Sequence, residues 1–171
     1  ISSIRIVNQF QAKKINVKKI PGKLRVLPIP ISIPPLIENK YDRSIGFLGR
    51  FHSERNLVEW ITIVLEAVKL GIINKVVLVG DGAEKVDIKS KLSQVKNIQV
   101  IDLGYLSNHE ITRGLSKMNV LLSCANLESY GLAIREAALS GVKVLTKENQ
   151  TTVELGENSY GLVTTYKTIQ E

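Results

Sequence analysis

Short apolar runs alternate with amphipathic stretches from residue 44 onward. The runs have the length of buried strands and are followed by glycines or polar turns. The stretches between them carry apolar residues three and four positions apart, the spacing of one helix face, and residues 54–70 with Gly71 after them are the clearest case. The pattern predicts strands at residues 45–49, 75–79, 98–101, 119–122, 142–145 and 161–165. It predicts helices at residues 54–70, 84–94, 107–117, 132–139 and 151–157, with a capping box at 107–110.

This alternation also predicts the fold class. Strands that alternate with helices pair in parallel and are joined by right-handed crossovers. We therefore expect an α/β protein: a single Rossmann-like domain with a parallel sheet and helices on both faces. The domain is expected to span residues 44–171, and the sequence contains no internal repeat.

Residues 1–43 have a different character, and we interpret them as a basic, Pro-rich connector. The net charge of the chain is +7, and this segment accounts for all of it. Residues 2–14 have the spacing of a basic amphipathic helix, and residues 23–28 have the pattern of a short strand followed by prolines, which interrupt regular structure. The basic residues between 5 and 25 could contact an anionic membrane surface, although a solvated basic face is the more ordinary interpretation. Phe10 is the lone aromatic residue among them, so nucleic-acid binding is not expected.

Composition narrows the class of protein further. The chain has 171 residues and is 44% apolar, which is enough for one domain with a hydrophobic core. One cysteine, Cys124, cannot form an internal disulfide, and this favours a reducing compartment. No apolar run approaches the ~20 residues of a membrane-spanning helix. We expect a cytoplasmic protein, with the cytoplasmic face of a membrane as the alternative location.

The most informative stretch is residues 123–141, which lie between two predicted strands. In a strand–loop–helix unit, ligands bind at the carboxyl end of the strand, where the helix N-terminus offers free N–H groups. Glu128 precedes the helix and Glu136 lies inside it, on the order of 10 Å away. This distance is too long for an acid/base pair acting on one bond, but it suits two sets of hydroxyls on one long ligand. The spacing alone leaves open the alternative that both are ordinary surface glutamates.

This stretch resembles the signature of glycosyltransferase family 4, also called glycosyl transferases group 1. The similarity lies in the two glutamates with seven residues between them, in Glu-Ser-Tyr-Gly-Leu at 128–132 and in Glu-Ala-Ala-Leu-Ser-Gly-Val-Lys-Val at 136–144. Members of this family are retaining enzymes of the GT-B fold, in which the C-terminal one of two Rossmann-like domains binds the nucleotide-sugar donor. The resemblance covers roughly residues 44–165. It implies that this chain is the donor half and that an N-terminal acceptor domain is missing from it.

The resemblance implies roles for the residues of this stretch. Glu128 would contact the sugar and count as catalytic, and Glu136 would bind the ribose. The N–H groups at Gly131 and Leu132 would meet the phosphate or the sugar. Tyr130, within the same motif, is also expected to bind substrate.

A second part of the expected site is a phosphate clamp. Arg50 follows Gly49 at the end of a predicted strand, and Arg55 lies five positions later. In the resembling family these two positions hold the diphosphate, the second usually as Lys, so Arg50 and Arg55 are expected to stabilise the leaving group and Gly49 to line the site. The sequence has no Asp-x-Asp pair, and the two histidines have no partners at ligand spacing. We therefore expect no metal and no cofactor, with the nucleotide diphosphate sugar acting as substrate.

Two further turns belong to the expected site by resemblance. Gly80 lies in a Gly-Asp-Gly turn after a strand, although the full dinucleotide-binding spacing is absent. Tyr105 and Leu106 lie in the turn that holds the nucleotide base in the family. Near residues 149–154 the family typically has a Gly-Gly turn before a glutamate, and here only Glu154 matches.

The sequence therefore predicts the donor-binding domain of a retaining, hexosyltransferase-type enzyme that acts on an unknown acceptor. As an isolated domain it is expected to be inactive. Two alternatives remain open. One is a non-catalytic nucleotide-sugar-binding or regulatory module, and the other is an interaction domain that uses the basic N-terminal segment.

Overall fold

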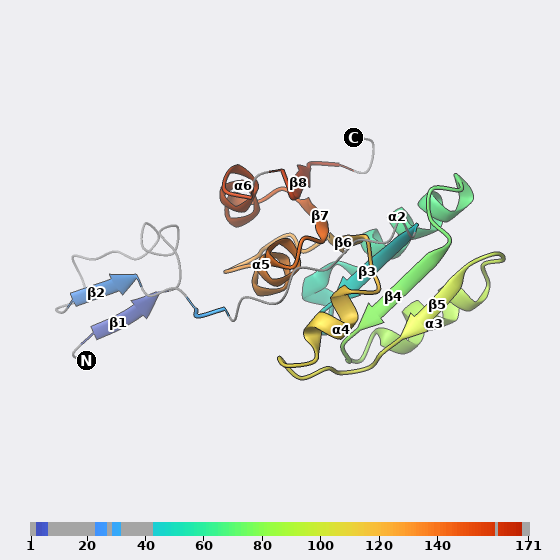
Figure 1. Ribbon diagram of the computed structural model, residues 1–171, viewed down its shortest axis with the longest axis horizontal. Helices are drawn as coiled ribbons and strands as arrows, with labels where there is room; N and C mark the ends of the chain where they lie inside the picture. The colour runs from blue at the N-terminus through green and yellow to red at the C-terminus, as the bar shows by residue number, and fades with distance from the viewer. Residues whose placement is uncertain (1–2, 7–22, 27–28, 32–42, 160, 169–171) are drawn as a thin grey trace.

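The computed structural model describes residues 3–6, 23–26, 29–31, 43–159 and 161–168. Its centre is a six-stranded sheet in the order β5-β4-β3-β6-β7-β8, in which every neighbouring pair is parallel (Figure 1). The strands are β3 (Ser44–Leu48), β4 (Lys75–Val79), β5 (Gln99–Asp102), β6 (Val120–Ser123), β7 (Lys143–Lys147) and β8 (Val163–Tyr166). The parallel α/β sheet predicted from the alternating pattern is confirmed.

Helices connect these strands and cover both faces of the sheet. They are the 3-10 helix η2 (Ser53–Arg55) and the α-helices α2 (Leu57–Lys69), α3 (Lys85–Ser93), α4 (Ile111–Leu115), α5 (Leu132–Leu139) and α6 (Gln150–Glu157). Side chains of α2 and α3 belong to one hydrophobic cluster, and side chains of α5 and α6 belong to a second. No helix of the described residues is long and apolar enough to cross a membrane.

The strand sequences explain why two cores form. Successive side chains of a strand point to opposite faces, so a strand buried on both sides is apolar throughout. In β4, Val76 and Leu78 join the cluster under α2 and α3, whereas Val77 and Val79 join the cluster under α5 and α6. Trp60 of α2 is fully buried in the first cluster.

Two predictions about local structure are wrong. Residues 3–6 do not begin an amphipathic helix: Ser3–Ile6 is strand β1, which pairs in parallel with β2 (Lys23–Val26) in a separate two-stranded sheet. Its β-branched isoleucines favour extended backbone, and the pairing with β2 outweighs the helical spacing. The remainder of the predicted helix, residues 7–14, lies outside the described residues.

The second error concerns the start of α4. The predicted capping box would begin a helix at Ser107, but α4 begins at Ile111. The carboxylate of Glu110 accepts hydrogen bonds from the backbone N–H and the hydroxyl of Ser107, at 3.1 and 2.7 Å. No side chain caps the N-terminus of α4, and residues 108–110 form a turn.

The connection order creates one special place at the carboxyl edge of the sheet. From β3 the chain moves outward through β4 to β5, and it then returns to place β6 on the other side of β3. The neighbouring strands β3 and β6 therefore send their following loops in opposite directions. In open α/β sheets, ligands bind in the crevice outside the carboxyl ends of such strands.

Candidate functional site

A cavity of about 420 Å³ opens at this edge, beside the ends of β3 and β4 and the start of α5. We call it the switch-point pocket. Eight residues predicted for the site line it: Gly49, Arg50, Arg55, Gly80, Tyr105, Leu106, Leu132 and Glu136. The remaining lining residues are Leu48, Val79, Asp81, Asn108, Ile111 and Ala133. Its volume lies within the range of small-molecule sites, about 300–1,000 Å³.

Backbone contacts between the strand-end turns form the floor of this pocket. The N–H of Gly49 donates to the carbonyl of Val79 at 3.0 Å, and the N–H of Gly80 donates to the carbonyl of Gly104 at 2.7 Å. Gly80 has a φ of 124°, and a Cβ atom there would lie 1.8 Å from the carbonyl oxygen of Gly49. The turn after β4 therefore needs glycine, because no side chain fits between the two turns.

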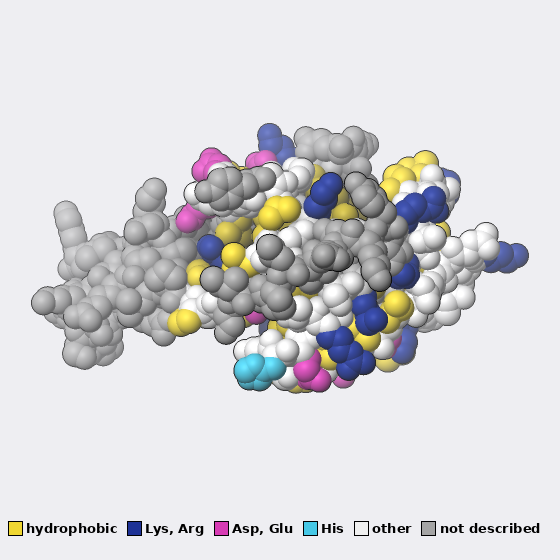
Figure 2. All heavy atoms as spheres, in the orientation of Figure 1, with side chains coloured by type: hydrophobic (Ala, Val, Ile, Leu, Met, Phe, Trp, Pro, Cys, Tyr) yellow, Lys and Arg dark blue, Asp and Glu magenta, His cyan; other side chains and the backbone are white. Residues whose placement is uncertain are grey.

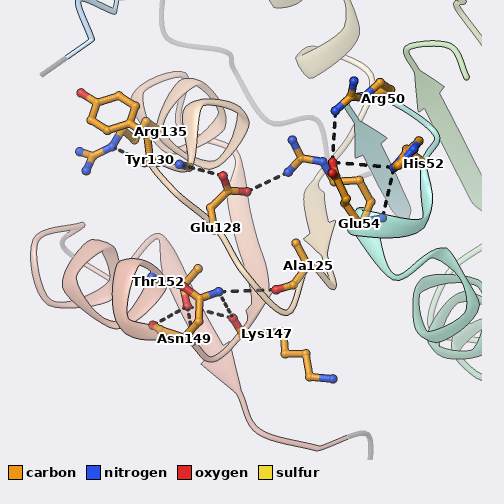
Figure 3. A network of polar contacts seen from close by, with 12 residues as sticks. Arg50, His52, Glu54, Ala125, Glu128, Tyr130, Arg135, Lys147, Asn149 and Thr152 are labelled. Carbon is orange, nitrogen blue, oxygen red and sulfur yellow. Dashed lines mark hydrogen bonds and ion pairs between the residues drawn. The ribbon is translucent and has the colours of Figure 1, made fainter. Parts of the chain in front are cut away.

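The two predicted clamp arginines lie in different electrostatic settings. Arg50 pairs with Glu54 at 3.1 Å, and both side chains are 67% exposed. Arg55 pairs with Glu128 at 2.8 Å, with exposed fractions of 34% and 12%. Figure 3 shows the Arg50–Glu54 pair and the bonds made by the Glu128 carboxylate. Exposed ion pairs contribute little, so the guanidinium of Arg50 can change partners at small cost, whereas that of Arg55 is held more firmly.

Glu128 links Arg55 to the start of α5. One of its carboxylate oxygens accepts from Arg55, and the other accepts the N–H of Gly131 at 3.1 Å. Gly131 precedes α5 with a φ of 73°, a conformation that favours glycine. The first turn of α5, which begins at Leu132, holds no acidic side chain. Since α5 follows the parallel strand β6, its N-terminus lies at the carboxyl edge of the sheet, where its N–H groups and partial positive charge would stabilise an anion.

Glu136 is the half-buried carboxylate of the pocket. It lies one turn into α5 and lines the cavity. Burial raises the pKa of its carboxyl group above the ordinary value. Within the described part of the chain, no hydrogen-bond or ion-pair partner of this carboxylate is present. A group that is partly desolvated and unpaired in a pocket is a candidate ligand contact.

Tyr130 lies apart from the pocket lining. Its hydroxyl donates to the carbonyl of Ile29 at 3.0 Å, and it is 7% exposed. The guanidinium of Arg135 lies over its ring at 4.3 Å, and the Arg135 Nε donates to the Tyr130 carbonyl at 3.0 Å (Figure 3). Tyr130 thus contacts the segment that precedes the domain, and its predicted role in substrate binding stays a prediction.

The turn in which the sequence lacks the family's Gly-Gly pair begins helix α6. Asn149 caps this helix by accepting from the N–H groups of Thr151 and Thr152, at 3.1 and 3.2 Å. The Thr152 hydroxyl accepts the Asn149 N–H in return, which completes a capping box. Glu154 is exposed on α6. Asp81 and Asn108 line the pocket but were not predicted from the sequence. They lie in the loops after β4 and β5, and this position is the signal that could have identified them.

Charge outside the pocket does not single out another site. Figure 2 shows Lys and Arg side chains interspersed with apolar, acidic and uncharged groups on the visible face of the described residues. Among the residues that the structure describes, no group of three or more His, Cys, Asp or Glu side chains could hold a metal ion. Cys124 is buried, and desolvation raises the pKa of its thiol to about 12, so it is not a reactive thiolate at neutral pH.

Comparison with solved structures gives the fold its relatives. TarM from S. aureus, solved with UDP, has a TM-score of 0.73 at 17% identity, over 88% of this chain and 30% of that one. The pneumococcal O-GlcNAc transferase GtfA, solved with UDP and GlcNAc, has a TM-score of 0.68 at 19% identity, over 86% of this chain and 30% of that one. HepE from Anabaena, solved with UDP-glucose, has a TM-score of 0.71 at 16% identity, over 99% of this chain and 51% of that one.

At these identities the likeness shows the fold alone, a Rossmann-like α/β domain such as the GT-B glycosyltransferases contain. The chain spans about a third of the length of the TarM and GtfA chains. None of the curated proteins compared with the sequence matches it. The family model described as glycosyl transferases group 1 matches residues 30–171, and the chain therefore belongs to the group 1 glycosyltransferases.

Proposed function

We propose that this chain binds the nucleotide diphosphate sugar donor of a retaining glycosyltransferase, and that the acceptor binds to a further domain. One observation carries the proposal. Arg50, Arg55 and Glu136 come from separate elements, and all three line one pocket at the switch point of the sheet. Two cations suit a diphosphate, and a carboxylate at this distance along the helix suits a ribose diol. UDP is our choice of nucleotide because the similar structures of TarM, GtfA and HepE contain UDP or UDP-glucose.

The proposed binding mode follows the layout of the pocket. The diphosphate lies between the two arginines and the N-terminus of α5. The ribose hydroxyls donate to Glu136, and the base lies against the turn of Tyr105 and Leu106. The sugar extends toward Glu128, whose carboxylate is oriented by its two hydrogen bonds.

The proposed chemistry places most of the catalytic work on the leaving group. Transfer breaks the bond between the anomeric carbon of the sugar and a phosphate oxygen, and negative charge develops on the diphosphate. Arg50 and Arg55 stabilise that charge without a metal: Arg55 is held by Glu128 before the reaction, and the exposed Arg50 exchanges Glu54 for the diphosphate. The contacts proposed for this chain are with the donor and not with an acceptor. The isolated domain is therefore expected to bind the donor without transferring its sugar.

Isothermal titration of the chain with UDP tests this proposal, with and without a chelator of divalent metals. Binding that persists in the chelator is expected, because arginines supply the positive charge. Arg50→Gln should weaken UDP binding by about ten- to hundredfold, since a hydrogen bond to a charged group contributes about 1.5–3 kcal/mol and the present partner of Arg50, Glu54, is exposed. Arg43→Gln is the matched control, because Arg43 is exposed and precedes β3 at the opposite edge of the sheet. Equal UDP affinity in the wild type and both variants would refute the proposal.

A second candidate is a binding or regulatory module without transfer. The observation in its favour is the capped start of α6, where residues 149–152 stand in place of the Gly-Gly turn typical of the family. Sugar release from UDP-glucose by the full-length protein separates the two candidates. Donor binding without any transfer to added acceptors would favour the module.

For either candidate we propose a cytoplasmic location, which the single buried cysteine supports. We also propose that the basic residues between 5 and 25 contact a membrane surface peripherally.

A further inference from the structure

A buried lysine joins two of the turns that form the switch-point pocket. Lys85, at the start of α3, is 8% exposed. Its Nζ donates to the carbonyl of Gly80 at 2.8 Å and lies 2.7 Å from Oδ1 of Asp102. Asp102 Oδ1 also accepts the N–H of Gly104 at 3.0 Å. One ammonium group and one carboxylate thus connect the turn after β4 with the turn after β5.

The burial of Lys85 distinguishes this ion pair from the surface ion pairs of the same helix, whereas its partner Asp102 is open to solvent at the end of β5. A buried ammonium costs free energy unless it is fully paired. The ring of Phe51 lies 5.6 Å from the Lys85 Nζ and covers it on one side. Burial would raise the pKa of Asp102, but hydrogen bonds from Lys85 and Lys89 hold that pKa at about 2. The Asp102 carboxylate is therefore charged at neutral pH, and both lysines contact it.

The turns after β4 and β5, which Lys85 and Asp102 join, form one side of the pocket. Gly80 lines the pocket and donates its N–H to the carbonyl of Gly104 at 2.7 Å. Tyr105 and Leu106 follow Gly104 directly and line the same pocket. A displacement of either turn would therefore change the distance between the Tyr105 side of the pocket and the end of β3. Lys85 and Asp102 do not line the pocket themselves.

We propose that Lys85 and Asp102 are positioning residues for nucleotide binding. They hold the turn of Tyr105 and Leu106 at the distance from the arginines that a nucleoside diphosphate requires, and neither side chain touches the ligand. This inference rests on the proposed function, because it assigns the nucleoside half of the ligand to this wall. It predicts that the pair matters for the nucleoside and not for the diphosphate alone.

Titration of Lys85→Met with UDP and with pyrophosphate tests the inference. Methionine keeps the buried apolar stem and removes the ammonium group. The affinity for UDP should fall by about ten- to hundredfold, since small displacements of positioning contacts have effects of this size. The affinity for pyrophosphate should be unchanged, because Arg50 and Arg55 remain in place. Asp102→Asn should give the same split between the two ligands and serves if Lys85→Met does not fold.

Two lysines of the same helix provide matched controls. Lys91→Met removes an exposed lysine whose ion-pair partner, at 2.8 Å, is Asp87 of the same helix and not a residue of the joined turns. Lys89→Met removes a cation from the same carboxylate, at 2.9 Å, without touching Gly80. Both should bind UDP as the wild type does.

The outcomes separate this inference from the proposed function. A wild-type chain that binds neither UDP nor pyrophosphate overturns the proposed function, and the inference with it. A wild-type chain that binds UDP, together with a folded Lys85→Met variant of equal affinity, overturns the inference alone. Equal losses for UDP and pyrophosphate in Lys85→Met and Asp102→Asn also overturn it, because a general structural role would not separate the two ligands.

Discussion

Glu136 should destabilise the fold and at the same time strengthen nucleotide binding. Its carboxylate is half-buried in the switch-point pocket, and burial raises its pKa above that of the unfolded chain. The folded state therefore binds this proton more tightly than the unfolded state does. By linkage, the carboxylate destabilises the fold above the folded pKa, and this destabilisation disappears as the pH falls toward the unfolded value.

Glu136→Gln removes the charge while it keeps the shape of the side chain. Since the group is partly solvated, screening limits the gain in the free energy of unfolding to about 0.5 kcal/mol at pH 7. For a chain of this size this corresponds to a rise of about 1–2 °C in Tm. The gain should vanish below about pH 4, where the wild-type carboxyl is protonated in both states.

The same substitution should weaken nucleotide binding. Two hydrogen bonds from a ribose diol change from charged to neutral, at about 1 kcal/mol each, so the Kd should rise by about thirtyfold. The loss should be equal for UDP and UDP-glucose, because both contain the ribose. Thermal unfolding and isothermal titration at pH 7 measure the two effects, and Glu157→Gln on the exposed side of α6 is the control. A lower Tm together with an unchanged Kd would refute this reasoning.

Three further outcomes are expected. Glu128→Ala should weaken UDP-glucose binding by about ten- to hundredfold in titration calorimetry, because its carboxylate is assigned to the sugar, and it should not weaken UDP binding, since its removal leaves Arg55 available to the diphosphate; equal losses for both ligands would contradict that assignment. Gly80→Ala should lower the free energy of unfolding by more than about 2 kcal/mol, since its Cβ would lie 1.8 Å from a backbone carbonyl oxygen, whereas Gly71→Ala, with open space around it, should cost about 1 kcal/mol. The wild type should lose stability as the pH falls from about 4 to about 2, where Asp102 with its depressed pKa takes up a proton, and Asp102→Asn should lack this component of acid unfolding in pH-dependent denaturation.

The parallel sheet could be predicted because its central strands β3, β4 and β6 are buried on both faces. In β4, four consecutive residues are almost fully buried, and such a run leaves a clear apolar signal. Gly71, which follows the helix predicted at residues 54–70, has a φ of 70°, the left-handed conformation that commonly ends a helix. Strand β1 was missed because its pairing partner lies about twenty residues later in the chain, and helical spacing over a few residues cannot reveal such a partner.

The pocket residues could be predicted where they follow strand ends, because parallel strands bring their carboxyl ends to one edge. Arg50 follows a strand end, Gly80 and Tyr105 were assigned to the site by the family resemblance, and all three line the switch-point pocket. Side-chain partners between distant segments left no such trace. The ion pair of Arg55 with Glu128 joins positions 73 residues apart, and nothing in either local sequence specifies it.

That ion pair decides how affinity is distributed over the site. A diphosphate that enters the pocket meets Arg55 already bonded to Glu128 at 2.8 Å, so its gain from this arginine is the difference between two charged hydrogen bonds. Affinity must therefore come from several moderate contributions: Arg50, whose partner is exposed, the first turn of α5 and the ribose contact of Glu136. No one of these residues identifies a nucleotide site by itself. A site built in this way is recognised from the sequence only when the spacing of all its parts is considered together.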